Sequence, residues 1–271
     1  MSNVTTVAEA KKPTFTMVIN SDGYKKLINN TLGDKNKAAR FVAGITSAVV
    51  TTPGLHECTP QSIISGGFLG EALNLSPSPQ LGQYYLVPYN DTKNECKVAQ
   101  FQLGYKGYIQ LAIRSGYYKK LNVLAIKEGE LVKFDPLNEE IEVLLIEDEE
   151  TRENAQTIGY YAMFEYSNGF RKAIYWSKSK MEKHAEQYSK GYKAKKGYTF
   201  WEKDFDAMAY KTMLRQLISK WGIMSTEMQE AMVKDMAVIN DDGSCDYVDT
   251  QQDEIIVQEE PEDKPLNLDE V

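Results

Sequence analysis

The sequence predicts an α+β protein with helices at both ends and a mostly antiparallel sheet between them. Near both ends, apolar residues recur at three- and four-residue spacing, which is typical of amphipathic helices. Short apolar runs separated by turn residues fill the middle, and an Asn168-Gly169 pair joins two of them as a hairpin. With 271 residues, 42% of them hydrophobic, the chain can bury a sizeable core.

Two helices are predicted in the first third of the chain. Residues 24–51 carry one continuous apolar face at helical spacing, and Pro53 follows as a helix breaker. Residues 60–75 form the second helix, because Thr59 suits the N-cap and Pro60 the first helical position.

Strands dominate the middle of the chain. Residues 84–89 and 97–103 flank a polar turn, so we expect a hairpin there, followed by a helix over residues 104–115. Further strands are expected at residues 121–127, 131–134, 141–146, 156–166 and 171–176, the last two joined by the Asn-Gly turn.

Helices return at the C-terminal end. We expect a charged helix over residues 177–189, a Gly/Lys-rich loop over 190–199 and a long amphipathic helix over 201–221 that Gly222 ends. A Met-rich helix over residues 226–236 follows.

Charge divides the chain into parts. The net charge is −8, yet residues 223–271 hold 15 acidic residues and 2 lysines, whereas residues 1–222 carry +5. We therefore expect a flexible segment over residues 1–20, a basic folded core over 21–238 and an acidic, disordered tail over 239–271. A basic domain with an acidic tail indicates a polyanionic partner, or a tail that only aids solubility.

The sequence also predicts the cellular compartment and whether the protein contacts a membrane. Three widely spaced cysteines indicate reduced thiols in a cytosol. No signal peptide and no apolar run of about 20 residues is visible, so we expect a cytoplasmic protein without a membrane partner.

Patterns for bond-making chemistry are weak. No Walker loop occurs in the sequence, so ATP-driven activity is not expected. Glu202, Asp204 and Asp206 are the most metal-like group, but acids at the start of a helix also stabilise its dipole. A metal-dependent nuclease is one function that the sequence leaves open, and a phage structural or assembly protein is another.

Cations and aromatic rings coincide in two stretches. Residues 96–127 contain no acidic residue, and residues 171–222 hold 13 bases against 5 acids. Cations follow the phosphates of a single nucleic-acid strand, and rings stack on its unpaired bases. The residues that we expect to contact such a strand are Lys106, Arg114, Lys119, Lys120, Arg171, Lys172, Lys178, Lys190, Lys193, Lys195, Lys196, Tyr198, Phe200, Lys211 and Arg215.

The long C-terminal helix gives the sharpest expectation. Lys211 and Arg215 are four residues apart and share one helix face, about one turn, or ~6 Å, along the axis. We expect this face to be exposed and to follow a phosphate backbone.

Three sequence blocks resemble a known family. They are SPQLGQYYLVPY at residues 78–89, QLGYKGY at 102–108 with 112–116 after it, and the segment 201–222. Together they span most of residues 35–222 in order. They resemble the RecT family of phage single-strand DNA annealing proteins, which are similar to the lambda beta proteins.

The resemblance implies ATP-independent annealing of single strands in recombination, by an oligomeric ring or helical filament that is not an enzyme. It implies DNA contacts for Lys106, Arg114, Lys211 and Arg215, whereas Lys190, Lys193, Lys195 and Lys196 rest on charge alone. It further implies single-stranded DNA and annealed duplex as partners, a partner exonuclease, and the single-strand binding protein of a bacterial host. No cofactor is expected, with Mg²⁺ only as a modulator of DNA binding.

Overall fold

A computed structural model describes residues 13–246 apart from residues 139, 198 and 241. This part of the chain is α+β, as predicted, but its strands form four small antiparallel sheets instead of one central sheet. Most strands pair only with their neighbour in sequence, because helices intervene between the hairpins.

The first lobe combines the N-terminal helices with a hairpin. Its elements are α1 (Phe15–Ile19), α2 (Asp22–Leu32), α3 (Lys35–Thr51), η1 (Leu55–Glu57), α4 (Pro60–Ala72), β1 (Tyr84–Asp91) and β2 (Cys96–Leu103). The single helix expected over 24–51 is two helices, because Gly33 has φ +66° and ends α2. Asp34 then starts α3 by accepting a hydrogen bond from the backbone N–H of Lys37.

The second lobe is built on a three-stranded sheet. β6 (Thr157–Tyr166) lies between β3 (Tyr118–Lys127) and β7 (Arg171–Ser177), and the Asn-Gly hairpin is confirmed. α7 (Lys178–Tyr188) and α8 (Lys190–Lys193) follow the sheet, the latter within the predicted loop.

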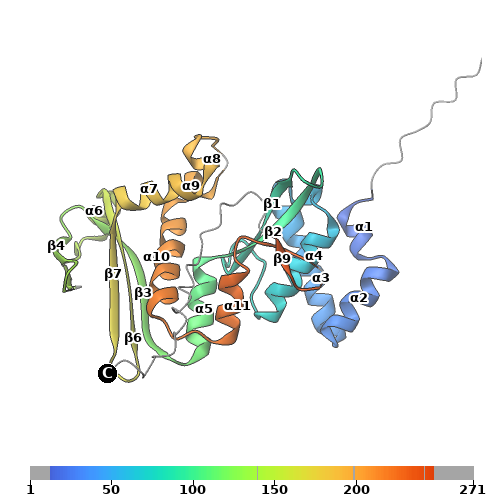
Figure 1. Ribbon diagram of the computed structural model, residues 1–271, viewed down its shortest axis with the longest axis horizontal. Coiled ribbons are helices and arrows are strands. Elements are labelled where there is room, and N and C mark those ends of the chain that lie inside the picture. The colour runs from blue at the N-terminus through green and yellow to red at the C-terminus, as the bar shows by residue number, and fades with distance from the viewer. Residues whose placement is uncertain (1–12, 139, 198, 241, 247–271) are drawn as a thin grey trace, which may run out of the picture.

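Helix α10 (Phe205–Trp221) belongs to both lobes (Figure 1). Its Leu214 and Ile218 pack into the core of the first lobe, whereas Met213 and Leu217 pack into that of the second. Helices α5 (Tyr105–Ser115) and α11 (Thr226–Val233) accompany it on the side of the first lobe. The predicted helix over 201–221 breaks at Asp204, which separates α9 (Phe200–Lys203) from α10.

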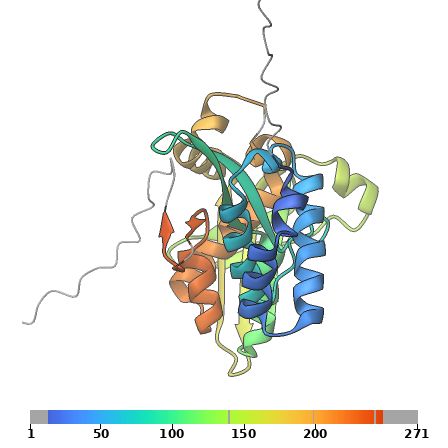
Figure 2. The same cartoon turned by 90° about the vertical axis from the view of Figure 1, so that its right-hand side faces the viewer.

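A hairpin projects from the second lobe between β3 and β6. It consists of β4 (Leu131–Asp135) and β5 (Glu140–Val143), and α6 (Glu149–Asn154) follows it. We call residues 131–146 the arm. In Figure 1 it lies at one end of the longest axis, and α1 and α2 lie at the other. Figure 2, turned by 90°, shows the N-terminal helices in front of the rest of the molecule.

Two short pieces of secondary structure lie at the predicted domain boundaries. α1 lies within residues 1–20, which we expected to be flexible. Its Phe15 and Ile19 are buried in the core of the first lobe. β8 (Val238–Ile239) and β9 (Cys245–Asp246) pair where we expected the tail to begin, and Ile239 is buried. The remainder of the predicted tail, residues 247–271, lies outside the described residues. Among the helices that are described, none combines the length and apolarity needed to cross a bilayer.

Candidate nucleic-acid interface

Two glycines bring the first two sequence blocks into contact. A Cβ added at Gly104 would lie 2.1 Å from the carbonyl oxygen of Gly82, and one at Gly107 would lie 2.2 Å from that of Gln83. The backbone N–H of Gly104 also donates to the Gln83 carbonyl at 2.8 Å. Only glycine therefore lets the loop before β1 lie directly against the start of α5.

Aromatic rings and one lysine gather beside this contact. The Tyr85 ring lies 5.6 Å from Phe200 and the Tyr105 ring 5.7 Å from Tyr210, between ring centroids. The Nζ of Lys106 lies 5.9 Å from the Tyr105 centroid. We call these five residues the ring cluster; β1, α5, α9 and α10 each contribute to it.

The ring cluster offers both apolar and cationic surface. Phe200 is 38% exposed, Lys106 is exposed and the tyrosines are half-buried. Burial raises the pKa of Tyr85 and Tyr210, so both hydroxyls stay neutral at physiological pH. A polyanion therefore meets flat rings and a positive charge here, and neither Tyr85 nor Tyr210 adds a negative charge.

Four lysines lie shortly before Phe200 in the chain. All are exposed, and none forms an ion pair with a residue that the structure describes. They are Lys190 and Lys193 on α8 and Lys195 and Lys196 after it, and we call them the α8 lysines. Tyr198, which was predicted to contact DNA, lies outside the described residues.

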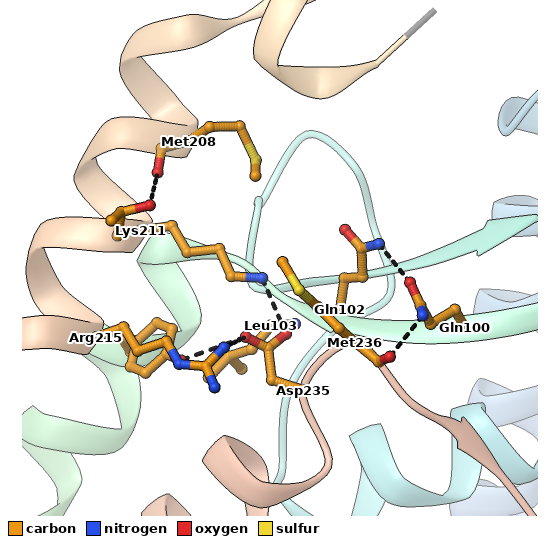
Figure 3. A network of polar contacts seen from close by, with 10 residues as sticks. Gln100, Gln102, Leu103, Met208, Lys211, Arg215, Asp235 and Met236 are labelled. Atoms are coloured by element: carbon orange, nitrogen blue, oxygen red, sulfur yellow. Dashed lines mark hydrogen bonds and ion pairs between the residues drawn. The ribbon is translucent and has the colours of Figure 1, made fainter. Parts of the chain in front are cut away.

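The expected exposed face of α10 is wrong for Lys211. Its Nζ lies 2.9 Å from Oδ1 of Asp235 and its side chain is 6% exposed (Figure 3). Both lobes pack against α10, so little of its surface is left to solvent. Burial lowers the pKa of Lys211, and the neighbouring carboxylate opposes this effect.

Asp235 organises a buried polar network around Lys211. It follows α11, accepts the backbone N–H of Leu103 at 2.8 Å and lies 3.5 Å from Nη1 of Arg215. Arg215 keeps 24% of its side chain exposed, so part of it can reach solvent. The network connects α10, β2 and the segment after α11, and its main role is structural.

Arg114 is also engaged within the protein. Its guanidinium donates to the carbonyl oxygens of Leu73 at 2.8 Å and Asn74 at 3.2 Å, at the end of α4. Cations at a helix C-terminus satisfy its last carbonyls and its dipole. This contact explains the position of Arg114 without a nucleic acid.

The remaining predicted cations divide between the two ends of α10. Lys119 and Lys120 pair with Glu165 at 2.8 and 3.4 Å, and Arg171 donates to the Tyr161 hydroxyl at 3.4 Å. Lys172 was expected to face DNA but is buried, with its Nζ 3.5 Å from the ring centroid of Trp221, at the end of α10. Lys178 instead lies 5.7 Å from the ring of Phe205, at the start of α10.

Because the predicted DNA-contacting residues lie at both ends of α10, one compact surface cannot contain all of them. The 17 residues of α10 are about 25 Å long. The predicted residues therefore do not form a single group, and the ring cluster with the α8 lysines lies at one end only.

Comparison with known proteins decides the family. The model of the RecT family matches residues 39–255 of the chain. The chain belongs to the RecT family. The resemblance seen in the three sequence blocks is thereby confirmed, and the matched range contains the whole ring cluster and the α8 lysines.

Two known proteins match this chain over most of their own length. The chain is 40% identical over 240 residues to the uncharacterized protein YqaK of Bacillus subtilis. The aligned residues are 86% of this chain and 78% of that relative. It is 29% identical over 221 residues to Protein RecT of Escherichia coli, and the aligned residues are 80% of this chain and 78% of that relative. Membership of the RecT family implies single-strand annealing in recombination, and RecT-family annealing proteins are not catalytic enzymes.

The acids that suggested a metal site have separate structural roles in this RecT-family chain. Glu202 completes a capping box with Thr199, and Asp204 caps α10 by accepting the N–H of Ala207 at 3.0 Å. Asp206 accepts the Tyr160 hydroxyl at 2.6 Å. Within the described residues, no group of three or more His, Cys, Asp or Glu side chains is placed to hold a metal ion.

The residues predicted to contact DNA do not include Tyr85, Tyr210 or Asp235, whereas Tyr105 lies within the stretch 96–127 that was singled out for its cations and rings. Tyr85 and Tyr105 lie inside the RecT-like blocks, but the tight packing of the glycines near them is visible only in the structure. A buried acid needs a paired cation, but nothing in the sequence around Asp235 shows that it is buried.

Proposed function

We propose that this RecT-family protein binds single-stranded DNA across the ring cluster and the α8 lysines and anneals complementary strands without ATP. The observation that carries the proposal is that four rings from four elements gather beside Lys106, with the exposed α8 lysines shortly before Phe200 in the chain. Single strands favour such surfaces, since each stacked base contributes about 1–3 kcal/mol and each phosphate releases counterions.

The start of α5 adds an electrostatic preference for phosphate. Its first turn has no acidic residue and no side-chain cap, and Lys106 lies within that turn. The positive end of the helix dipole and the Lys106 ammonium then act on the same phosphate.

Annealing follows from how the strand is held. Phosphates lie toward the cations, a few bases stack on Phe200 and Tyr85, and the remaining base edges face outward. Watson–Crick pairing with a second strand supplies the sequence reading, so the protein needs no contacts to base edges. The sequence has no P-loop, which supports annealing without ATP, with Mg²⁺ acting only on DNA affinity.

The setting of this activity belongs to the same proposal. An annealing protein needs single strands, so an exonuclease acts before it and a host single-strand binding protein occupies the same substrate. We propose that the protein works as an oligomer, a ring or a helical filament, in the recombination of a phage or prophage.

The experiment compares annealing of two fluorescent complementary oligonucleotides, without nucleotide, by wild-type protein and by Phe200→Ala and Tyr85→Ala variants. Loss of one stacking partner lowers the affinity for a single strand by about tenfold, within the 1–3 kcal/mol of one stacked base. Tyr117→Ala is the matched control, because Tyr117 is 49% exposed and does not belong to the ring cluster. A larger effect for Tyr117 than for Phe200, or a requirement for ATP, would contradict the proposal.

A further inference from the structure

The arm is fixed rigidly to the second lobe. At its base, the fully buried Glu130 accepts Nε of Arg152 at 2.6 Å and the backbone N–H groups of Lys127 and Ile146 at 2.8 and 3.2 Å. The Phe134 ring also packs 5.0 Å from that of Tyr175 on β7. Arg152 donates a second hydrogen bond to Glu130 from Nη2, at 3.3 Å. Because a buried carboxylate with four hydrogen bonds holds it, the arm is a preformed projection and not a loose loop.

This projection exposes apolar side chains. Leu137 is 87% exposed, Leu144 73% and Val132 57%. Exposed apolar residues gathered on one projecting element indicate a surface that another protein covers.

Acidic side chains surround the apolar ones. Residues 128–154 contain 11 acidic residues and 2 basic ones, a net charge of −9. Glu142, Glu147 and Glu150 are exposed and form no ion pair with any residue that the structure describes. The surface that covers the arm therefore needs apolar and basic side chains.

The opposite end of the molecule has this composition. Residues 13–51, which form α1 to α3, contain 5 basic and 2 acidic residues. Met17 is 65% exposed and Leu27 41%. The basic residues Lys25, Lys26, Lys35, Lys37 and Arg40 are all exposed and form no ion pair within the described part of the chain.

We propose that the arm of one protein molecule docks on helices α1 to α3 of the next, by apolar contact inside a rim of opposite charges. The two surfaces differ and lie at opposite ends of the longest axis (Figure 1), so the contact is head-to-tail. A head-to-tail contact repeats and forms a ring or a helical filament. The inference rests on the proposed function, because it supplies the interface of the proposed oligomer.

The first test removes the apolar part of the contact. Leu137→Ser with Leu144→Ser weakens self-association at least tenfold, measured without DNA by sedimentation velocity over a concentration series. Ile113→Ser is the matched control, because Ile113 is also exposed, at 60%, but lies on α5. Equal association of the double variant and the wild type would overturn the proposal.

The second test exchanges the charges. One variant carries Glu128→Lys, Glu142→Lys, Glu147→Lys, Glu150→Lys and Glu153→Lys, which changes the net charge of residues 128–154 from −9 to +1. The other carries Lys25→Glu, Lys26→Glu and Lys37→Glu, which changes the net charge of residues 13–51 from +3 to −3. Each variant alone has like charges on both surfaces and remains dissociated, whereas an equimolar mixture associates by alternating the two chains. A mixture that stays dissociated, or single variants that associate like the wild type, would overturn the proposal.

A separate measurement distinguishes failure of the proposed interface from failure of the proposed DNA-binding function. Binding of an oligonucleotide too short to span two protein molecules is measured for every variant, with circular dichroism to verify folding. The proposed interface predicts unchanged short-strand affinity in the Leu137→Ser, Leu144→Ser variant together with lost association. Loss of short-strand binding in that folded variant would place DNA on the arm and overturn the assignment.

Discussion

At the residue scale, Lys211 shows how a correct pattern can lead to a wrong assignment. Its spacing from Arg215 was sufficient to predict that both share a face of a helix, and they do. The sequence spacing cannot tell which face is covered, because that depends on Asp235, 24 residues later in the chain. Phe200 was also predicted to contact DNA, and it is 38% exposed, whereas the adjacent Trp201 is buried. The contact of Phe200 with DNA stays a prediction.

Replacing Asp235 by Asn tests the structural role of the network. The change leaves the ammonium of Lys211 buried without its counter-charge, so we expect a loss of about 3–5 kcal/mol in the free energy of unfolding. Urea denaturation followed by circular dichroism measures it. Glu186→Gln, on the exposed side of α7, serves as control and should change stability by less than about 0.5 kcal/mol. A similarly small effect of Asp235→Asn would disprove the buried-network account.

At the element scale, hairpins and caps were predictable, whereas pairings between distant elements were not. The Asn168-Gly169 turn needs only local backbone geometry, and Gly169 indeed has φ +86°. The packing of the loop 78–83 on α5 depends on Gly104 and Gly107, and a sequence alone does not say what approaches a glycine.

Replacing Gly104 by Ala tests this packing. The added Cβ would overlap the carbonyl oxygen of Gly82, which is backbone and cannot rotate away, so the loop must shift. We expect lower stability and at least a tenfold loss of single-strand affinity, because Tyr85 and Lys106 move apart. Fluorescence anisotropy with a labelled oligonucleotide measures the affinity. Gly23→Ala is the control, since nothing lies within 4 Å of its added Cβ. Equal affinities of the two variants would argue against the packing.

The arm should depend on pH through Glu130. Burial disfavours the charge of Glu130, but hydrogen bonds from Arg152, Lys127 and Ile146 outweigh it and hold the pKa below its ordinary value of 4.5. A carboxylate with a lowered native pKa stabilises the fold above its ordinary pKa, and this contribution is lost as the pH falls through the native pKa. The arm should therefore loosen only below about pH 4.5.

Glu130→Gln should loosen the arm already at neutral pH, by about 2 kcal/mol, since it leaves buried donors without a charged acceptor. Hydrogen exchange of the backbone amides in residues 131–146 reports this directly. The exposed Glu142→Gln should leave exchange in the arm unchanged. Wild-type exchange rates in the Glu130 variant would show that the carboxylate does not hold the arm.

At the scale of the whole molecule, α10 couples two hydrophobic cores. The fold class could be predicted, because helical periodicity and hairpin signals act locally. The division into two lobes could not, since it depends on Leu214 and Leu217 facing different cores from one helix. This division also explains why the predicted DNA residues are spread over both ends of α10.

Because both cores include α10, the protein should unfold in one cooperative step. Leu214→Ala and Leu217→Ala remove fully buried side chains from different cores, and each should cost about 2–5 kcal/mol. Unfolding in urea, followed by tryptophan fluorescence and by circular dichroism, should give coincident transitions in both variants. Two separated transitions would mean that the lobes are independent.

The salt dependence of single-strand binding tests the central assignment most directly. A variant with Lys190, Lys193, Lys195 and Lys196 all changed to Ala loses four cations, so the slope of log affinity against log salt should decrease by about 3, at roughly 0.7 per phosphate contact. The variant Lys119→Ala with Lys120→Ala, at the other end of α10, should change the slope little. An unchanged slope in the first variant and a reduced slope in the second would contradict the location of the DNA surface.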